Sequence, residues 1–333
     1  MLPRLLPASL AVLLVACQAT PTVPQVLRGP APTRVNGPLV QQFLSPRPRA
    51  AETQEAGTLG TAAFSSYASV HEVGSNGAQS ATFDGELWRT GVFLRYGIDK
   101  RSEVEVELPF LWTSSGFLDG PIEVWHALFG FTNGGREDRP SNDWDMRLES
   151  NGVVAFEMDP DEFGVCDIPV LWTYRLYDET YELPALALRA GLELPVGSVN
   201  RGFGNGGLDA SIGIVGQKSR GDWTFLGGVD YVAVSTPSGF EDAGLESPDR
   251  IQAWLSCELR HDERTSWLVA LRHAPPATRD IELDEVERFN LDLDLGVAFD
   301  LTSDVRLMAG FSEDIWTGSG VDLTGWIGVW SAR

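Results

Sequence analysis

The chain has 333 residues, of which 43% are hydrophobic, and it carries 25 basic against 47 acidic side chains, a formal net charge of −22. This acidic balance argues against nucleic acid as a partner, because a polyanion would be repelled. The length allows either one large all-β unit or two domains, so composition alone does not choose between them.

Residues 1–16 are predicted to be a secretory signal peptide. Their apolar run, 10–15, is too short to span a membrane. The run ends in Leu-Val-Ala before Cys17, which resembles the bacterial lipoprotein signal, whose cysteine is acylated and becomes the new N-terminus. We therefore expect Cys17 to be lipidated and to anchor the protein on the periplasmic leaflet of the outer membrane. The alternative is an ordinary signal peptide followed by an incidental cysteine.

Residues 17–57 are predicted to be a lipidated, disordered tether. The segment is rich in Pro, Ala, Thr and Gln and shows no hydrophobic period. Its basic residues are Arg28, Arg34, Arg47 and Arg49. The acidic surplus of the chain therefore lies in the folded part, residues 58–333.

The folded part is predicted to consist of about twelve strands. In the clearest pair, 88–98 and 104–112, apolar and polar residues alternate with period two on either side of a polar turn. The strand-like runs in chain order are 61–72, 82–98, 103–112, 167–177, 182–194, 208–218, 223–235, 250–260, 266–274, 289–301, 305–312 and 321–330. An even number of strands is typical of single-chain outer-membrane barrels.

The connections between these runs alternate in length. The short ones are 99–102, 178–181, 219–222, 261–265 and 302–304, and the long ones are 73–81, 113–166, 195–207, 236–249, 275–288 and 313–320. Outer-membrane barrels have short periplasmic turns and long external loops, whereas a soluble sandwich does not sort its loops in this way. We therefore predict an all-β fold, a transmembrane antiparallel β-barrel of about 12 strands that spans the outer membrane.

One face of the predicted strands is charged, and in a barrel this face lines the lumen. The predicted lumen charges are Arg89, Arg95, Glu103, Glu105, Glu107, Asp292 and Asp294. Unpaired charges in a confined space are costly, so the two signs together indicate a filled or constricted interior. Tryptophans near both ends of the strands, such as Trp88 and Trp223, indicate two aromatic girdles.

The longest loop, 113–166, is predicted to hold a short helix that acts as a plug. Within residues 120–142, Ile122 shares one helical face with three of the candidate plug residues. An apolar patch on an exposed loop is unfavourable, so we expect this face to pack on the barrel rim or in its mouth. The glycines allow a sharp return, and the arginine can reach lumenal carboxylates. The candidate plug and mouth residues are Trp125, His126, Phe129, Gly134, Gly135, Arg136 and Asn142.

The chain resembles a family of uncharacterised bacterial proteins with predicted outer-membrane β-barrels, a domain of unknown function. The resemblance rests on three stretches: WHALFGFTNGGREDRPSN, LRYGIDKRSEVEVELPF and LRAGLELPVGSVNRGFGNGGLD. It covers most of residues 61–330 and implies an outer-membrane barrel without implying an activity. Gly325 and Trp330 are similar to the C-terminal assembly signal of such barrels, which implies the barrel-assembly machinery as a partner, although Gly328 departs from that signal.

Three functions are compatible with these features, and the first is favoured. It is a narrow channel or binding barrel for a small solute. The second is a structural envelope barrel, in contact with outer-membrane lipid, whose acidic outer loops are bridged by divalent cations to lipopolysaccharide. The third is an outer-membrane lipid hydrolase built on His71, His126 or His273 with Ser114 or Ser115. No spacing singles out a triad, so no catalytic residue is assigned, and neither a metal site nor a cofactor is expected.

Overall fold

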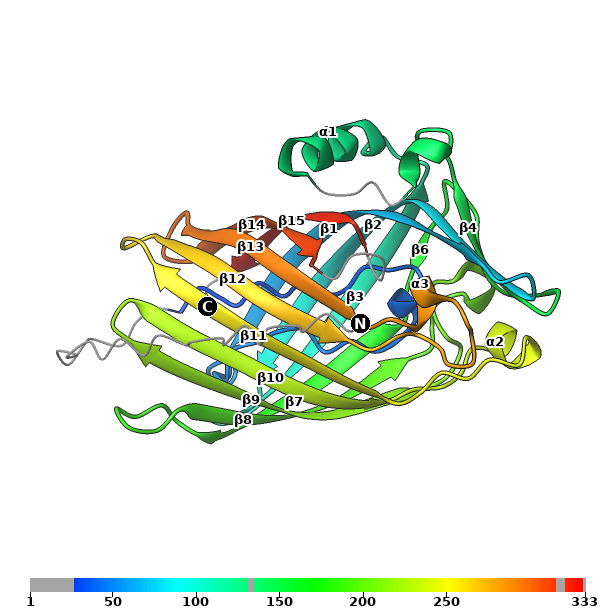
Figure 1. Ribbon diagram of the computed structural model, residues 1–333. Coiled ribbons are helices and arrows are strands. Elements are labelled where there is room, and N and C mark those ends of the chain that lie inside the picture. The colour runs from blue at the N-terminus through cyan, green and yellow to red at the C-terminus, as the bar shows by residue number, and fades with distance from the viewer. Residues whose placement is uncertain (1–26, 131–134, 316–320, 332–333) are drawn as a thin grey trace, which may run out of the picture.

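The structure, a computed structural model, describes residues 27–130, 135–315 and 321–331. Within these ranges, twelve antiparallel strands close into a barrel (Figure 1). In order around the barrel they are β1 (Leu59–Ser75), β2 (Gln79–Gly97), β3 (Ser102–Ser114), β7 (Ile168–Tyr177), β8 (Ala185–Leu194), β9 (Asp209–Arg220), β10 (Trp223–Ala233), β11 (Arg250–Arg260), β12 (Thr265–Ala274), β13 (Asn290–Asp300), β14 (Val305–Asp314) and β15 (Leu323–Ser331). β15 pairs with β1 and closes the ring. This confirms the predicted all-β antiparallel barrel of about twelve strands.

The long loop 113–166 contains more regular structure than the predicted short helix. It holds α1 (Asp119–Phe129), η2 (Arg136–Asp138) and three short strands, β4 (Asp145–Ser150), β5 (Val153–Met158) and β6 (Phe163–Val165). β4 pairs with the first part of β2, and β6 pairs with the last part of β3. The loop therefore extends the barrel wall beyond the point where β2 and β3 separate.

The two ends of the barrel differ in the length of their connections. At one end, which we call the turn end, residues 221–222 join β9 to β10 and residues 261–264 join β11 to β12. Asp262 shapes the second turn, because its Oδ1 accepts hydrogen bonds of 2.8 Å from the backbone N–H groups of Arg264 and Thr265. The other end, which we call the loop end, carries β4 to β6, α2 (Ser238–Asp242) and α3 (Asp284–Glu287) (Figure 1).

The outward face of the barrel wall is apolar. On β11, Leu255 is 68% exposed, whereas its neighbours Trp254 and Ser256 point inward and are buried. The same period of two recurs around the ring. Other exposed outward residues are Ile212, Phe225, Val229, Trp267, Leu271, Ile327 and Val329. In a membrane-spanning barrel such a face contacts lipid hydrocarbon. Among the described residues, the helices are all too short or too polar to cross a membrane.

A charge placed on the outward face is expected to destabilise the barrel in proportion to its depth. Leu255→Arg should lower the free energy of unfolding by about 2–4 kcal/mol, because the guanidinium would replace an apolar group in hydrocarbon. Val73→Arg, at an equally outward position near the loop end of β1, should cost about 0–1 kcal/mol. Urea titration of the refolded variants in lipid vesicles measures both values. Equal costs at the two positions would contradict a membrane-facing surface.

Candidate functional site in the barrel lumen

The barrel lumen is occupied by residues 27–57, the described part of the predicted tether. The segment starts at the turn end, where the Leu27 carbonyl accepts a hydrogen bond of 2.8 Å from Arg306 Nη1. It runs to the loop end, turns at η1 (Val40–Gln42), and returns to the turn end, where the Gly57 N–H donates to the Gly97 carbonyl at 2.7 Å. Figure 1 shows this N-terminal segment in blue inside the barrel. We call residues 27–57 the inserted segment.

The structure therefore corrects the prediction of a disordered tether for residues 27–57. The physical reason is that the segment is ordered by polar contacts with the barrel wall, which need no hydrophobic period. All four of its arginines lie within the lumen, and Arg28, Arg34 and Arg47 are buried. Cys17, with the predicted lipidation site, lies outside the described residues, as does the predicted signal peptide.

The outgoing pass of the inserted segment is held by wall carboxylates on β11 and β13. Arg28 Nε donates to Asp300 Oδ2 at 2.7 Å, and the Arg28 backbone N–H donates to Glu258 at 3.0 Å. Farther along the lumen, Thr33 Oγ1 donates to Asp294 Oδ2 at 2.7 Å. These contacts give Glu258 hydrogen-bond partners and add to the pairs that Asp294 and Asp300 form with Arg272 and Arg306 of the wall.

The returning pass is held by wall carboxylates on β3. Arg47 forms a bidentate ion pair with Glu107, with Nε–Oε2 and Nη2–Oε1 distances of 2.9 and 2.6 Å. Arg49 Nη2 lies 2.7 Å from Glu105 Oε2. Arg47 Nη1 also donates to the Pro32 carbonyl at 2.7 Å and so links the two passes to each other. Planar, bidentate pairs of this kind are the strongest charge-assisted hydrogen bonds in proteins.

The tip of the inserted segment packs in a hydrophobic cluster at the loop end. Leu39 and Phe43 are buried there, and the Arg250 guanidinium lies 4.0 Å from the centre of the Phe43 ring. Arg34 Nη2 closes the tip by donating to the Val40 carbonyl at 3.2 Å. Other residues of the cluster are Phe83, Leu111, Phe156, Phe203, Phe240, Ile281 and Leu283. The mouth of the barrel is therefore closed by apolar packing around the tip.

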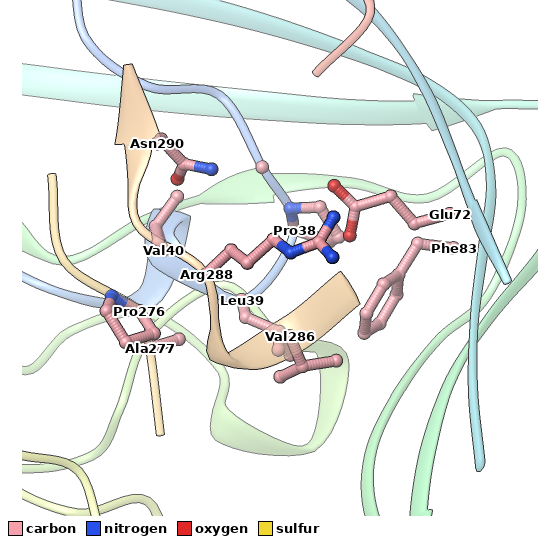
Figure 2. Close-up of a pocket in the computed structure, with 11 residues that line it drawn as sticks. Pro38, Leu39, Val40, Glu72, Phe83, Pro276, Ala277, Val286, Arg288 and Asn290 are labelled. Carbon is pink, nitrogen blue, oxygen red and sulfur yellow. The ribbon is translucent and has the colours of Figure 1, made fainter. Parts of the chain in front are cut away.

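A small cavity of about 40 Å³ remains where the tip meets the loops. Figure 2 shows Pro38, Leu39 and Val40 among the residues that line it, and the charged ends of Glu72 and Arg288 pointing toward one another. A second cavity, of about 210 Å³, lies at the turn end between the two passes and the wall. Its lining includes Arg28, Arg49, Glu52, Thr53, Arg95 and Arg306. The larger free space thus lies at the turn end and is polar.

The seven predicted lumen charges all project inward in the structure. Arg89, Glu103, Glu105, Glu107, Asp292 and Asp294 are buried, and Arg95 is half-buried. Some of these charges form ion pairs within the wall, because Arg272 lies 2.8 Å from both Asp292 and Asp294. Sequence reasoning missed the partners that the inserted segment supplies. Their signal was a run of arginines without an acidic residue between positions 27 and 51.

The described part of the predicted plug, residues 120–130 and 135–142, does not fill the lumen. α1 lies outside the barrel wall, alongside β1, β2 and β15 (Figure 1). Its start is fixed by Glu86 on the outward face of β2, whose Oε1 accepts hydrogen bonds from the backbone N–H groups of Phe117, at 2.8 Å, and Leu118. Because these contacts hold α1 against the outer surface, the expectation that it enters the mouth is wrong.

Arg136 contacts Asp119 and Asp322 instead of the predicted lumenal carboxylates. The Asn142 backbone N–H also donates to Asp119, at 2.6 Å, and Gly135 has the positive φ of 89° that starts η2. Among the other candidate plug residues, His126 is buried. Gly134 and the side chains of Trp125 and Phe129 lie outside what the structure describes. Arg136 therefore braces α1 to the start of β15.

Arg136→Ala is accordingly expected to weaken the loop without opening the lumen. The change leaves two carboxylates without their arginine, which should lower the free energy of unfolding by about 3 kcal/mol. Arg147→Ala, at an exposed ion pair on β4, should cost less than about 1 kcal/mol. Urea titration measures the stabilities, and planar-bilayer recording checks the conductance. A rise in the conductance of Arg136→Ala would contradict this expectation and support the hypothesis that α1 is the plug.

Three residues of the hydrolase hypothesis, His71, His273 and Ser114, lie in separate contacts. His71 Nδ1 lies 3.3 Å from Asp84 Oδ1, and the His273 ring packs 5.4 Å from that of Phe289. Ser114 Oγ accepts a hydrogen bond from the Gly116 N–H at 3.0 Å. None of these three contacts joins a serine to a histidine, as a nucleophile and its base would require.

A closed antiparallel barrel with an apolar outside and a charged lumen is the fold of outer-membrane β-barrel proteins. The chain belongs to the family described as "Protein of unknown function (DUF3187)", whose model matches residues 8–330. This confirms the resemblance noted in the sequence.

One solved structure, the first of the three described next, supports the same fold. The outer membrane channel COG4313 from Pseudomonas putida F1 is similar at 14% identity and a TM-score of 0.55, over 85% of this chain and 98% of that one. The NanC porin is 9% identical over 82% of this chain and 99% of its own, with a TM-score of 0.44. The Pseudomonas putida toluene transporter TodX is 10% identical over 83% and 88%, with a TM-score of 0.37. No curated protein sequence matches the chain significantly.

Proposed function

We propose that this protein is an outer-membrane channel for a small solute and that the inserted segment is its plug, which must move for the channel to conduct. The observation that carries the proposal is how the segment is held. Three arginines and several backbone N–H groups bind charged residues of the wall, and the described segment continues into the wall at β1. The turn end then faces the periplasm and the loop end faces outward.

The size of the barrel supports the same function. The interior of an eight-stranded barrel is filled by its own side chains, and the interior widens as strands are added. Here twelve strands enclose two passes of extra chain. Without those passes, the lumen would be a water-filled pore lined by charged groups. The similar fold of the COG4313 outer membrane channel is in line with this proposal.

The contacts of the plug also favour a reversible displacement. Charged groups that leave an ion pair are solvated when water enters the lumen, so the net cost of breaking each pair falls as the pore hydrates. The largest apolar side chains that the segment buries in a cluster are at the tip, Leu39 and Phe43, whereas Ala31 and Ala51 pack in smaller clusters along the lumen. Release of the tip is therefore the step that we expect to limit opening.

Exchange of the plug for a neutral linker tests this function. Residues 28–51 are replaced by a Gly/Ser segment of equal length, and residues 120–142 are deleted in a second variant. Planar-bilayer conductance should rise well above the wild-type level in the first variant and stay at that level in the second. If circular dichroism shows that the barrel of the first variant is folded and its conductance stays at background, the proposed channel function is contradicted.

A structural envelope role is the second candidate, and one observation favours it. The hydrophobic cluster at the loop end packs the tip of the inserted segment against loops that contribute Phe203, Phe240 and Ile281. A permanently closed barrel would have such a mouth. In this alternative, divalent cations bridge the acidic outer loops to lipopolysaccharide, and removal of the plug charges would reduce stability without opening a path.

The lipid anchor is part of the same proposal. Leu27 lies at the turn end, ten residues after Cys17, and ten extended residues reach at most about 33–36 Å. An acylated Cys17 can therefore lie in the periplasmic leaflet while the inserted segment enters the lumen. Cys17→Ser should abolish incorporation of labelled palmitate while the barrel is still assembled. Unchanged labelling would contradict the anchor.

A further inference from the structure

The wall around Arg47 has the composition of a guanidinium-binding site. Glu107 accepts two hydrogen bonds from the guanidinium edge, at 2.9 and 2.6 Å. The guanidinium carbon lies 5.2 Å from the centre of the Phe93 ring and 5.7 Å from that of Phe64. Both rings are buried and face the lumen from β2 and β1. A carboxylate at the edge together with aromatic rings nearby recognises a planar organic cation.

Arg49 repeats this arrangement one step along the lumen. Its Nη2 lies 2.7 Å from Glu105 Oε2, and its guanidinium carbon lies 5.2 Å from the centre of the same Phe93 ring. Phe93 thus contacts two guanidinium groups, each paired with its own glutamate. We call Phe64, Phe93, Glu105 and Glu107 the cation cradle.

The backbone beside the cradle leaves room for this geometry. A Cβ atom at Gly91 would lie 2.6 Å from Glu107 Oε1, so a side chain there would push the carboxylate away from its partner. Glycine at this position of β2 therefore allows Glu107 to lie flat against the strand.

The cradle also keeps a negative charge of its own when the inserted arginines are absent. Glu103, Glu105 and Glu107 on β3 face two wall arginines on β2, Arg89 and Arg95, which leaves one carboxylate in surplus. A surplus carboxylate in a partly dry lumen is unfavourable unless a cation binds beside it.

We propose that the cation cradle is a solute-binding site for guanidinium-type organic cations, and that Arg47 and Arg49 occupy it in the closed state in the manner of such a solute. The proposal rests on the channel function, and it names the class of solute: a small molecule with a planar guanidinium head. Solute and plug compete for the same carboxylates, so binding of the solute favours displacement of the plug.

The test is chemical rescue in the full-length protein. Arg47→Ala removes the guanidinium that is bound to Glu107 and leaves Arg49 bound to Glu105. The variant should have a raised planar-bilayer conductance. Ethylguanidinium at millimolar concentration should then reduce this conductance and raise the thermal midpoint of the variant. Ethylammonium carries the same charge but lacks the planar guanidinium group with its paired N–H donors. Its effect on conductance and on the thermal midpoint should therefore be about tenfold weaker. Phe93→Leu added to Arg47→Ala should weaken rescue by ethylguanidinium by about tenfold and leave the raised conductance in place.

The outcomes separate this proposal from the channel function. Raised conductance in Arg47→Ala with equal responses to ethylguanidinium and ethylammonium would overturn the cradle and keep the channel. Background conductance with selective thermal stabilisation by ethylguanidinium would keep the cradle as a binding site and overturn the channel. If Arg47→Ala does not fold, Arg49→Ala replaces it, because Glu105 retains Arg95 at 3.5 Å. Absence of selective rescue in that variant also overturns the cradle.

Discussion

Arg47→Glu is expected to open the lumen and to lower the free energy of unfolding by at least about 3–5 kcal/mol. The substitution removes a buried bidentate pair and places a second carboxylate beside Glu107. It also removes the hydrogen bond to the Pro32 carbonyl that links the two passes. The inserted segment should therefore leave the lumen, and planar-bilayer conductance should rise far above the wild-type level.

Arg101→Glu is the matched control for this change. Arg101 has the same charge and lies exposed in the turn between β2 and β3, outside the lumen. Its replacement should change stability by less than about 0.5 kcal/mol and leave conductance unchanged. An Arg47→Glu protein that unfolds at the wild-type urea concentration and stays closed would show that the ion pair with Glu107 does not hold the plug.

Phe43→Ala is expected to release the tip of the inserted segment from the loop end. Phe43 is fully buried, and truncation of a buried phenylalanine costs about 3–5 kcal/mol. The change also removes the ring that covers Arg250, whose Nε and Nη2 have no hydrogen-bond partner in the described part of the chain. Hydrogen exchange of residues 34–46 should rise by several orders of magnitude, because the tip opens locally.

The matched control for Phe43→Ala is Phe117→Ala, at a phenylalanine that is 64% exposed on the outer surface. It should leave exchange of residues 34–46 at the wild-type rate. If Phe43→Ala also leaves that exchange unchanged, the apolar cluster at the mouth is not what closes the barrel.

The barrel wall was predictable because its physical signal is local. Each strand pair, such as 88–98 with 104–112, shows the alternation with period two in its own sequence. The alternation of short turns with long loops can also be read directly along the chain. The charged face of β3, with Glu103, Glu105 and Glu107, was likewise assigned to the lumen from its own sequence. The mixture of signs there also indicated a filled or constricted interior.

The identity of the filling was not predictable by the same means. Residues 27–57 have no periodicity, because they form irregular chain whose polar contacts go to several different strands of the barrel wall. Their arginines pair with carboxylates 56 to 272 positions away in sequence, and local patterns cannot report such pairs. α1 was assigned to the mouth from its apolar face alone. The feature that decides its place is Glu86, an acid on the outward face of β2.

The central claim is that the inserted segment closes the channel and must move for it to conduct. Ser45 Oγ on the segment donates to Gln252 Oε1 on the wall at 3.1 Å, so cysteines at these two positions can be joined by a short bis-thiosulfonate linker. Cys166 and Cys257, both free thiols, are first replaced by serine. Single-channel recording then compares the linked protein with the same protein after reduction, with each single cysteine as a control. We predict that the linked protein is silent at all voltages and that openings appear when reductant cleaves the linker. Equal conductance before and after cleavage, or silence in both states, would contradict the account.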